Sequence, residues 1–417
     1  MKPEIKQRIE QIKAGQVPAG YKKTKIGIVP TEWNNTCFSD LFVSKSKYTE
    51  DLEKYPLYSL TIEDGVTAKS ERYERSHLVK KENAYKVVEP DDFAYNPMNV
   101  RFGAVARHKG NIPVSVSGYY DIFTTTEKTD LKFMDSFLVS DVMIKYYNKV
   151  STGSLVEKQR VHFSEFIGFD LPLPYPEERE RIAEVLSAQD KVIKLKEKLL
   201  DEKKKQKKYL MQQLLTGKKR LPGFNEEWID VRLGEVFTER VETNCQELEL
   251  LSLTGTSGVV PRSTIETKDN SSEDKSKYLR ICKGDIGYNT MRMWQGVSAL
   301  SEHEGIVSPA YTILTPNEKI SAKYFSYLFK MHAVIFLFYR FSQGIVDDTR
   351  SLKYREFAKL HLKVPSSKKE QSAIAEILAK ADEEFGMLQE EIEQEKQKKK
   401  ALMQLLLTGI VRVEVNK

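Results

Sequence analysis

The chain has 417 residues, of which 40% are hydrophobic and 30% charged, and its formal net charge is +6. This length and hydrophobic content predict a folded protein of two to three domains, and the charge allows a polyanionic partner without establishing one. Cys37, Cys245 and Cys282 are too few and too scattered for a disulfide framework or a metal pair, and no early stretch is typical of a signal peptide. We therefore expect reduced thiols, a cytoplasmic location and no membrane role.

The chain begins with a segment, 1–25, that is expected to be helical. From 26 to 174 it has short runs rich in Val, Ile, Tyr and Phe, such as Val114–Val116 and Tyr119–Thr125, broken by Gly, Pro and Asn. Such runs predict several strands in a mixed α/β domain. The region 218–365 has the same character, so we expect a second domain of this class.

Each globular region is followed by a long stretch that predicts a single helix, at 175–217 and at 366–409, and a tail at 410–417 ends the chain. Pro176 suits the first turn of a helix, and Ser367 followed by Glu370 is a typical helix start. Gly217 and Gly409 are placed as helix stops.

Apolar residues at three-four spacing predict a coiled-coil seam on each helix. In the first helix these residues are Val185, Ala188, Val192, Leu195 and Leu199. In the second helix they are Ile374, Leu378, Ala381, Phe385, Leu388 and Ile392. The first helix is rich in Lys over 191–208 and the second is acidic over 382–400, so antiparallel pairing is expected because parallel pairing would bring Lys runs together. Solvated faces are the alternative reading of these charges.

The two halves repeat one another at a nearly constant spacing. Tyr95-Asn96 matches Tyr288-Asn289, and both tyrosines are expected in the core. The helices match best. Ile182–Leu186 (IAEVL) corresponds to Ile374–Leu378 (IAEIL), and Leu210–Gly217 (LMQQLLTG) corresponds to Leu402–Gly409 (LMQLLLTG). A repeat of this length predicts a duplicated architecture.

Two divergent domains, each followed by such a helix, resemble the DNA specificity subunits of Type I restriction-modification systems over essentially the full chain. The sequence Leu171–Pro174 (LPLP) before the first helix adds to the resemblance. It implies an α/β (α+β) fold with two pseudo-twofold related target recognition domains, 26–174 and 218–365, joined by two long antiparallel coiled-coil helices. One departure is Glu178-Arg179, where the family has Glu-Gln as at Glu370-Gln371. This position is expected only to open the helix.

The resemblance also implies the partners. They are double-stranded DNA with a bipartite target, two modification (methyltransferase) subunits and restriction (translocase-endonuclease) subunits, so the protein would be nucleoid-associated. The partner subunits, not this chain, would bind S-adenosylmethionine, ATP and Mg. The chain itself is expected to be non-catalytic.

The sequence predicts that the chain has no catalytic or metal site. No phosphate loop or Gly-rich nucleotide turn is present, and the six His residues have no metal-ligand spacing. The run Asn96–Asn99 (NPMN) lacks the second proline and the aromatic residue of an adenine methyltransferase motif. The alternatives are a coiled-coil scaffold without a DNA role, or a recognition fragment of a fused restriction-methyltransferase.

DNA contacts are expected from basic and amide side chains of the two globular regions, because phosphates attract cations and base edges accept bidentate groups. In the first region the candidates are Lys45, Lys47, Lys69, Arg72, Arg75, Asn96, Asn99, Arg101, Arg107 and Arg160. In the second they are Arg240, Arg262, Lys268, Lys275, Lys277, Arg292, Trp294, Gln295, Gln343, Arg350 and Lys353. Lys69 and Arg262 coincide in the repeat, as do the neighbourhoods of Arg160 and Arg350, which favours phosphate contacts there. A solvated surface charge is the alternative for each residue.

Overall fold

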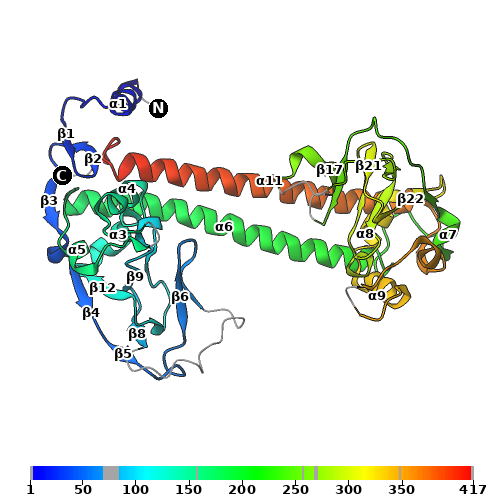
Figure 1. Cartoon of the computed structure of the whole chain (residues 1–417), viewed down its shortest axis with the longest axis horizontal. Helices are drawn as coiled ribbons and strands as arrows, with labels where there is room; N and C mark the ends of the chain where they lie inside the picture. The colour runs from blue at the N-terminus through cyan, green and yellow to red at the C-terminus, as the bar shows by residue number, and fades with distance from the viewer. Residues whose placement is uncertain are drawn as a thin grey trace. The chain divides into compact units, whose positions relative to one another are not determined.

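The computed structural model describes residues 3–68, 84–155, 158–255, 258–266, 271–346 and 349–414 (Figure 1). It divides into two compact units, the first made of 1–196 with 391–417 and the second of 197–390. No helix among the described residues is both long and apolar enough to cross a membrane. Four of the candidate DNA contacts, Lys69, Arg72, Arg75 and Lys268, lie outside the described residues.

The first unit is built of antiparallel sheets and short helices. Its strands are β1 (Tyr21–Thr24), β2 (Gly27–Pro30), β3 (Asn34–Cys37), β4 (Phe42–Lys45), β5 (Tyr48–Thr49), β6 (Tyr58–Thr61), β7 (Gly65–Ala68), β8 (Tyr85–Val88), β9 (Phe93–Tyr95), β10 (Val105–Arg107), β11 (Val114–Ser117), β12 (Asp121–Thr125) and β13 (Asp170–Leu173). Its short helices are α1 (Pro3–Lys13), α2 (Phe38–Leu41), α3 (Leu131–Phe137), α4 (Asp141–Val150) and α5 (Phe163–Ile167). The main sheet has the strand order β10-β9-β12-β4.

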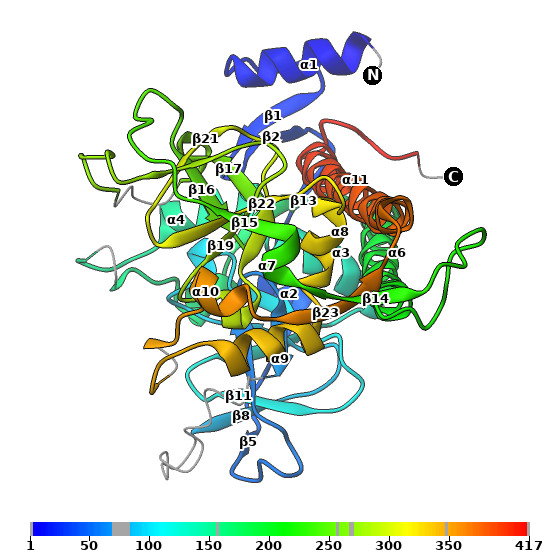
Figure 2. The same cartoon turned by 90° about the vertical axis from the view of Figure 1, so that its right-hand side faces the viewer.

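The second unit repeats this plan. Its strands are β14 (Trp228–Arg232), β15 (Phe237–Arg240), β16 (Leu251–Thr254), β17 (Gly258–Pro261), β18 (Leu279–Ile281), β19 (Ile286–Asn289), β20 (Ser298–Leu300), β21 (Gly305–Val307), β22 (Tyr311–Pro316) and β23 (His361–Pro365). Its short helices are α7 (Leu233–Val236), α8 (Ala322–Leu328), α9 (His332–Phe341) and α10 (Tyr354–Phe357) (Figure 2). The sheet order β15-β22-β19-β20 is the counterpart of β4-β12-β9-β10, so the sequence repeat is also a repeat of topology.

Each unit has an aromatic core that continues into the long helices. Tyr95 and Tyr288 are fully buried at equivalent places on β9 and β19, which confirms that they are core residues. The first core includes Ile182 and Leu186, and the second includes Ile374 and Leu378. Because these residues come from the long helices, each globular part is anchored by burial of apolar surface and not only by chain connection.

The long helices are α6 (Pro176–Leu214) and α11 (Lys368–Leu406), and Gly217 and Gly409 follow them with φ of +70° and +68°. Their contacts within each unit run antiparallel, as the charge pattern predicted. In the first unit Lys196 pairs with Glu391 at 2.9 Å and Asp190 with Lys399 at 2.6 Å. In the second unit Lys203 pairs with Glu384 at 2.8 Å, and Lys207 pairs with Asp382. The helices lie side by side in both figures.

The predicted seam on the second helix is confirmed at its ends, where Ile374, Leu378 and Ile392 are buried, but the predicted seam on the first helix is wrong. The residues of that prediction are exposed, including Val185, Val192, Leu195 and Leu199, and the buried ones are Ile182, Leu186, Gln189, Ile193 and Leu200. The first helix carries two stripes of heptad spacing, and the buried stripe is the one interrupted by a polar residue. Gln189 is accommodated there because its amide donates to the backbone and side-chain oxygens of Glu395 at 3.2 and 2.7 Å.

The position of Arg179 and Gln371 does more than open a helix. The Gln371 side chain accepts from the Ser321 backbone N–H at 2.9 Å and donates to Pro365 O at 2.9 Å. Arg179 instead forms a buried ion pair with Asp130, with Nε and Oδ1 2.8 Å apart but without hydrogen-bond geometry. Asp130 and Ser321 both precede the first residue of a helix, α3 and α8. The expectation that this position only starts the helix is therefore wrong. In both units its side chain, Arg179 or Gln371, connects the long helix to the globular part.

Candidate DNA-recognition surface

Both units carry a 3₁₀ turn between two strands of the main sheet. In the first unit this is η3 (Val100–Phe102), between β9 and β10, and in the second it is η7 (Met293–Gln295), between β19 and β20. Gly103 and Gly296 end the turns with φ of +98° and +80°, a left-handed conformation that favours glycine. Helix α4 packs on η3 and helix α9 packs on η7.

A short closed loop follows each of these helices. It is held by a backbone bridge between Thr152 and Arg160 in the first unit and between Gln343 and Ser351 in the second. The chain then returns to the turn, because Val161 N–H donates to Pro97 O at 3.0 Å and Leu352 N–H donates to Thr290 O at 2.9 Å. The turn, the helix and the loop thus form one surface in each unit.

In the second unit this surface brings together five of the candidate DNA contacts. The Arg350 guanidinium lies 4.1 Å from the ring centre of Tyr339, and the Trp294 ring lies edge-on to Tyr339 at 6.0 Å. Trp294 Nε1 donates to Met291 O at 2.9 Å, so its ring is held in place. The other members, Arg292, Gln295 and Gln343, are exposed. Exposed Arg and Gln beside ordered aromatic rings can supply both phosphate and base-edge contacts.

In the first unit the same surface is made from other residue types. Arg101 is buried and donates to Gln159 Oε1 at 2.6 Å, and its guanidinium lies 4.6 Å from the Phe102 ring centre. Asn148 donates to Arg101 O at 2.9 Å. Asn99 is exposed, whereas Asn96 is buried and its Oδ1 accepts from the backbone N–H of the second and third residues after it, at 3.1 and 3.3 Å.

The two loops also show which residues of the two units correspond to one another. Because Thr152–Arg160 and Gln343–Ser351 are equivalent bridges, Arg350 corresponds to Gln159 and Arg160 corresponds to Ser351. Three positions of the surface then differ between the units. They hold Arg101, Asn148 and Gln159 in the first unit, and Trp294, Tyr339 and Arg350 in the second.

The other candidate cations of the main sheet are engaged by acidic side chains. Lys45 on β4 pairs with the buried Asp92 at 2.5 Å, and Arg240 on β15 pairs with the buried Asp285 at 2.9 Å, at equivalent places. Burial raises the pKa of Asp92, and the hydrogen bond from Lys45 acts against that rise. Loss of such a cation would leave a buried carboxylate unpaired, which destabilises the fold whether or not the cation also contacts DNA.

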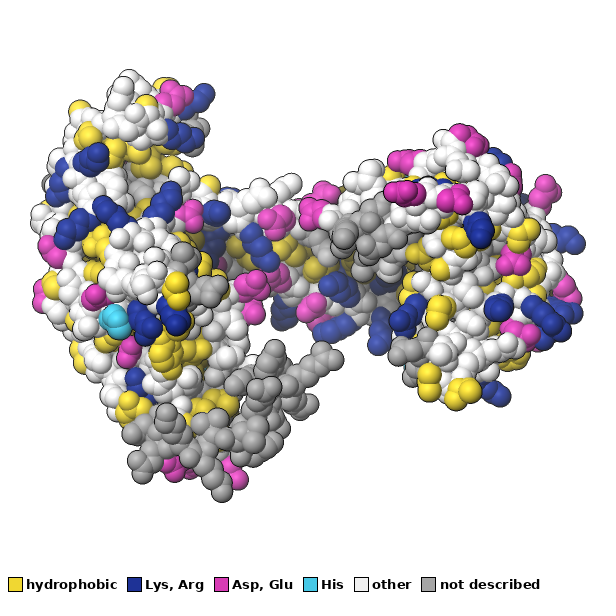
Figure 3. All heavy atoms as spheres, viewed as in Figure 1, with side chains coloured by type: hydrophobic (Ala, Val, Ile, Leu, Met, Phe, Trp, Pro, Cys, Tyr) yellow, Lys and Arg dark blue, Asp and Glu magenta, His cyan; other side chains and the backbone are white. Residues whose placement is uncertain are grey.

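The remaining candidates are distributed over both units. Arg107 contacts Asp91 and lies 3.6 Å from Asp135, and Lys47 lies 3.2 Å from Glu89. Those with intermediate exposure or full exposure elsewhere on the surface are Arg160, Arg262, Lys275, Lys277 and Lys353. On the face shown in Figure 3, Lys and Arg side chains of both units are interspersed with Asp and Glu. The DNA roles of all these residues stay predictions.

Sequence reasoning missed several residues of this surface. Phe102, Gln159 and Tyr339 were not among the candidates, nor were the apolar loop residues Leu155, Ile345 and Val346, which are 55%, 96% and 57% exposed. The available signal was the recurrence of Ser-x-Gly at Ser151–Gly153 and Ser342–Gly344, which marks equivalent loops in both halves.

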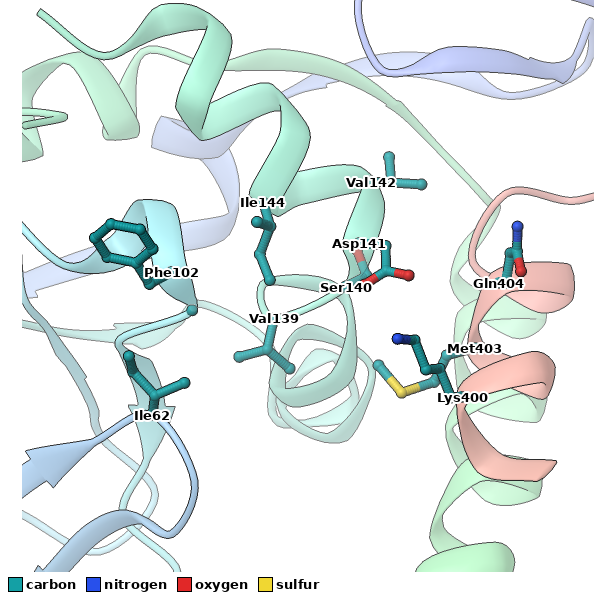
Figure 4. A pocket seen from close by; sticks show the side chains of 11 residues that line it. Ile62, Phe102, Val139, Ser140, Asp141, Val142, Ile144, Lys400, Met403 and Gln404 are labelled. Atoms are coloured by element: carbon teal, nitrogen blue, oxygen red, sulfur yellow. The ribbon is translucent and has the colours of Figure 1, made fainter. Parts of the chain in front are cut away.

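A pocket of about 310 Å³ lies beside η3 in the first unit, between that turn and helix α11 (Figure 4). Val139, Ile62 and Met403 line it. At the place of Val139 the second unit has Lys330, whose ammonium donates to Gly296 O at 2.8 Å and Ser298 O at 2.6 Å. Burial lowers the pKa of Lys330. The second unit thus braces its turn with a cation where the first has apolar space.

Comparison with known proteins identifies the second half of the chain. Residues 225–397 match the family model of the Type I restriction modification DNA specificity domain. This region is therefore similar in sequence to such specificity domains. Over 100 residues the chain is also 32% identical to the MjaVIII Type I restriction enzyme specificity subunit of Methanocaldococcus jannaschii. That match covers 24% of this chain and 23% of the relative, so it spans about a quarter of the relative's length.

Two solved structures share the fold of nearly the whole chain. One is the S subunit of a Type I restriction-modification system from M. genitalium, with a TM-score of 0.52 and 15% identity over 90% of this chain and 96% of that one. The other belongs to a study of complex assembly and conformational transition of the type I R-M system, with a TM-score of 0.54 and 15% identity over 92% and 99%. The resemblance to Type I specificity subunits is confirmed, and so is the mixed α/β fold with two long helices.

Proposed function

We propose that this chain is the DNA specificity subunit of a Type I restriction-modification complex. It recognises a bipartite DNA target and directs adenine methylation or cleavage by partner subunits, and it has no catalytic activity of its own. The observation that carries the proposal is the duplicated surface of turn, helix and loop, whose scaffold is shared by the two units and whose side chains differ.

A shared scaffold with different side chains suits a reader of two unlike half-sites. Contacts to phosphates position a protein on DNA without reading sequence, whereas side chains that reach base edges specify it. The unit with Trp294, Tyr339 and Arg350 presents an aromatic and cationic surface. The unit with Arg101, Asn148 and Gln159 presents amides around a buried guanidinium. We expect each unit to read its own half-site.

The partners in this proposal are two modification subunits and restriction subunits, which would bind S-adenosylmethionine, ATP and Mg. The exposed stripe that α6 carries in the first unit, formed by Val185, Val192 and Leu195, supports binding of a partner subunit, because its heptad spacing suits packing against a further helix. A coiled-coil scaffold without a DNA role is not favoured, since the specificity-domain match includes the surface of the second unit.

Co-expression with modification subunits, followed by methylome sequencing, tests the proposal. We expect adenine methylation at a two-part motif with a non-specific gap. Exchange of 26–174 for the equivalent region of a related protein should change one part only. Absence of methylation with an active partner, or a change of both parts, would contradict the proposal.

A variant of the exposed surface sharpens this test. Arg292→Ala with Gln295→Ala removes two exposed side chains of η7, so we expect binding of the second half-site to weaken about tenfold or more, as for loss of one good base contact. Lys319→Ala, an exposed cation in the turn before α8, is the matched control and should leave binding unchanged.

A further inference from the structure

We propose that Ile345 and Val346 read the C5-methyl groups of thymine in the major groove of the half-site bound by the second unit. This inference rests on the proposed function. The two residues, called the apolar pair below, lie in the loop that follows α9, and they are 96% and 57% exposed. An apolar side chain with almost its whole surface in water gains most from a ligand that covers it.

The described backbone on the two sides of this loop is held together. Its legs are joined by the backbone bridge between Gln343 and Ser351, and Thr349 Oγ1 donates to Val346 O at 2.9 Å. Gly344 has φ of +142°, and a Cβ there would lie 2.6 Å from Thr349 O. Only glycine fits this close approach, which fixes the backbone next to Ile345.

The loop that carries the apolar pair also carries a residue type that commonly contacts DNA phosphates. Arg350 belongs to the loop and stacks on Tyr339, which in turn contacts Trp294. The apolar pair therefore shares its loop with a cation that stacks on an ordered ring, and in this proposal a duplex held by its phosphates at that cation also meets the pair. The apolar feature that a duplex offers in the major groove is the thymine methyl group.

The first unit supplies the comparison. Its loop has the same bridge and the same glycine, since Gly153 has φ of +144° and a Cβ there would lie 2.9 Å from the backbone of Gln159. Ser154 occupies the place of Ile345, and Leu155 the place of Val346. The bridge and the glycine are therefore constant, while the two residues after the glycine change from Ile and Val to Ser and Leu. This pattern is expected of a specificity-determining position.

The experiment uses the complex of the full chain with its modification subunits. Once methylome sequencing has given the motif and the exchange of 26–174 has assigned its halves, each thymine of the second half-site is replaced in turn by deoxyuridine, which lacks only the methyl group. Equilibrium binding is measured by fluorescence anisotropy. We expect at least one replacement to weaken binding by about fourfold, which corresponds to about 0.8 kcal/mol for one buried methyl-sized group.

The double variant Ile345→Ser with Val346→Ser should bind the thymine and uracil duplexes equally. Ile229→Ser, a change of a 45% exposed side chain on β14, is the control and should keep the full difference. The inference is overturned if that half-site has no thymine or if no thymine is sensitive to replacement. It is also overturned if the double variant still prefers the thymine duplex as strongly as the wild type does, whether or not its overall affinity falls. A complex that binds DNA without sequence preference would instead refute the proposed function.

Discussion

Each unit has an ion pair between an Arg that follows one long helix and a Glu in the first turn of the other long helix, and we call this pair the clamp. The two units differ in the further hydrogen bonds that the Glu of the clamp accepts. In the first unit Arg412 donates to Glu178 at 2.6 and 2.9 Å, and Trp33 Nε1 donates to the same carboxylate at 3.2 Å. In the second unit Arg220 donates to Glu370 at 2.7 and 2.8 Å. There the equivalent Trp228 Nε1 is buried and has no hydrogen-bond partner among the described residues.

A second difference lies where α3 or α8 meets the long helices. Tyr327 of α8 donates to Asp382 at 2.7 Å, and the ammonium of Lys207 lies 5.1 Å from its ring centre. In the first unit the place of Tyr327 is taken by Ser136, which lines a pocket of about 420 Å³ together with Asp190 and Lys399. The duplicated fold thus keeps its ion pairs and varies the side chains around them, so each unit serves as a template for changes in the other.

The largest effect is expected from the buried pair that occurs in the first unit alone. Arg179→Gln leaves Asp130 without its cation, and the side chains of both residues are less than 10% exposed in the native pair, at 9% and 3%. We expect the free energy of unfolding to fall by about 3 kcal/mol, the lower end for a buried pair that loses one partner. Adding Asp130→Ser recreates the Gln–Ser arrangement of the second unit and should restore most of the loss. Denaturant unfolding measures the free energy of unfolding of the single and the double variant. A double variant no more stable than Arg179→Gln would contradict the view that the second unit shows which side chains can replace this pair.

The same pair predicts a pH dependence. Burial raises the pKa of Asp130 and Arg179 opposes the rise, so Arg179→Gln should raise this pKa further. A carboxyl whose pKa is higher in the folded than in the unfolded chain destabilises the fold above the folded pKa, and protonation removes the penalty as pH falls through it. The difference in unfolding free energy between wild type and Arg179→Gln should therefore shrink from pH 7.5 toward pH 5. A constant difference would show that the lost charge is not the cause.

A smaller effect is expected from the two clamps. Arg220→Ala should lower the free energy of unfolding by about 2 to 3 kcal/mol, less than for a fully buried pair because Arg220 is 31% exposed. Arg412→Ala should cost about 1 to 2 kcal/mol, since the donor Trp33 remains on Glu178. Hydrogen exchange at the first turns of α11 and α6 locates each loss. Equal costs, or the reverse order, would show that the Trp33 hydrogen bond adds nothing.

The smallest effect is expected from filling the pocket of about 420 Å³ that Ser136 lines in the first unit. Ser136→Tyr copies Tyr327 and should raise the free energy of unfolding by about 0.5 to 1 kcal/mol, as cavity-filling changes commonly do. Ser136→Phe is the matched control, because it fills the same space without a hydroxyl group for Asp190. Thermal unfolding compares them, and an advantage of Phe over Tyr would mean that the hydroxyl does not reach Asp190.

The sequence by itself determined the duplication, the two long helices with their glycine stops and their antiparallel pairing, because near-identical motifs and opposite charge runs are local and readable. It also predicted the buried tyrosines, since the repeat register placed Tyr95 beside Tyr288. The tertiary structure alone decided which stripe of α6 is buried. Two stripes have the same spacing, and the burial of Ile193 together with the hydrogen bonds of Gln189 to Glu395 shows that the stripe interrupted by a polar residue faces the partner helix. It alone gathered Trp294, Tyr339 and Arg350, because residues far apart in the chain meet only when turn, helix and loop have packed together.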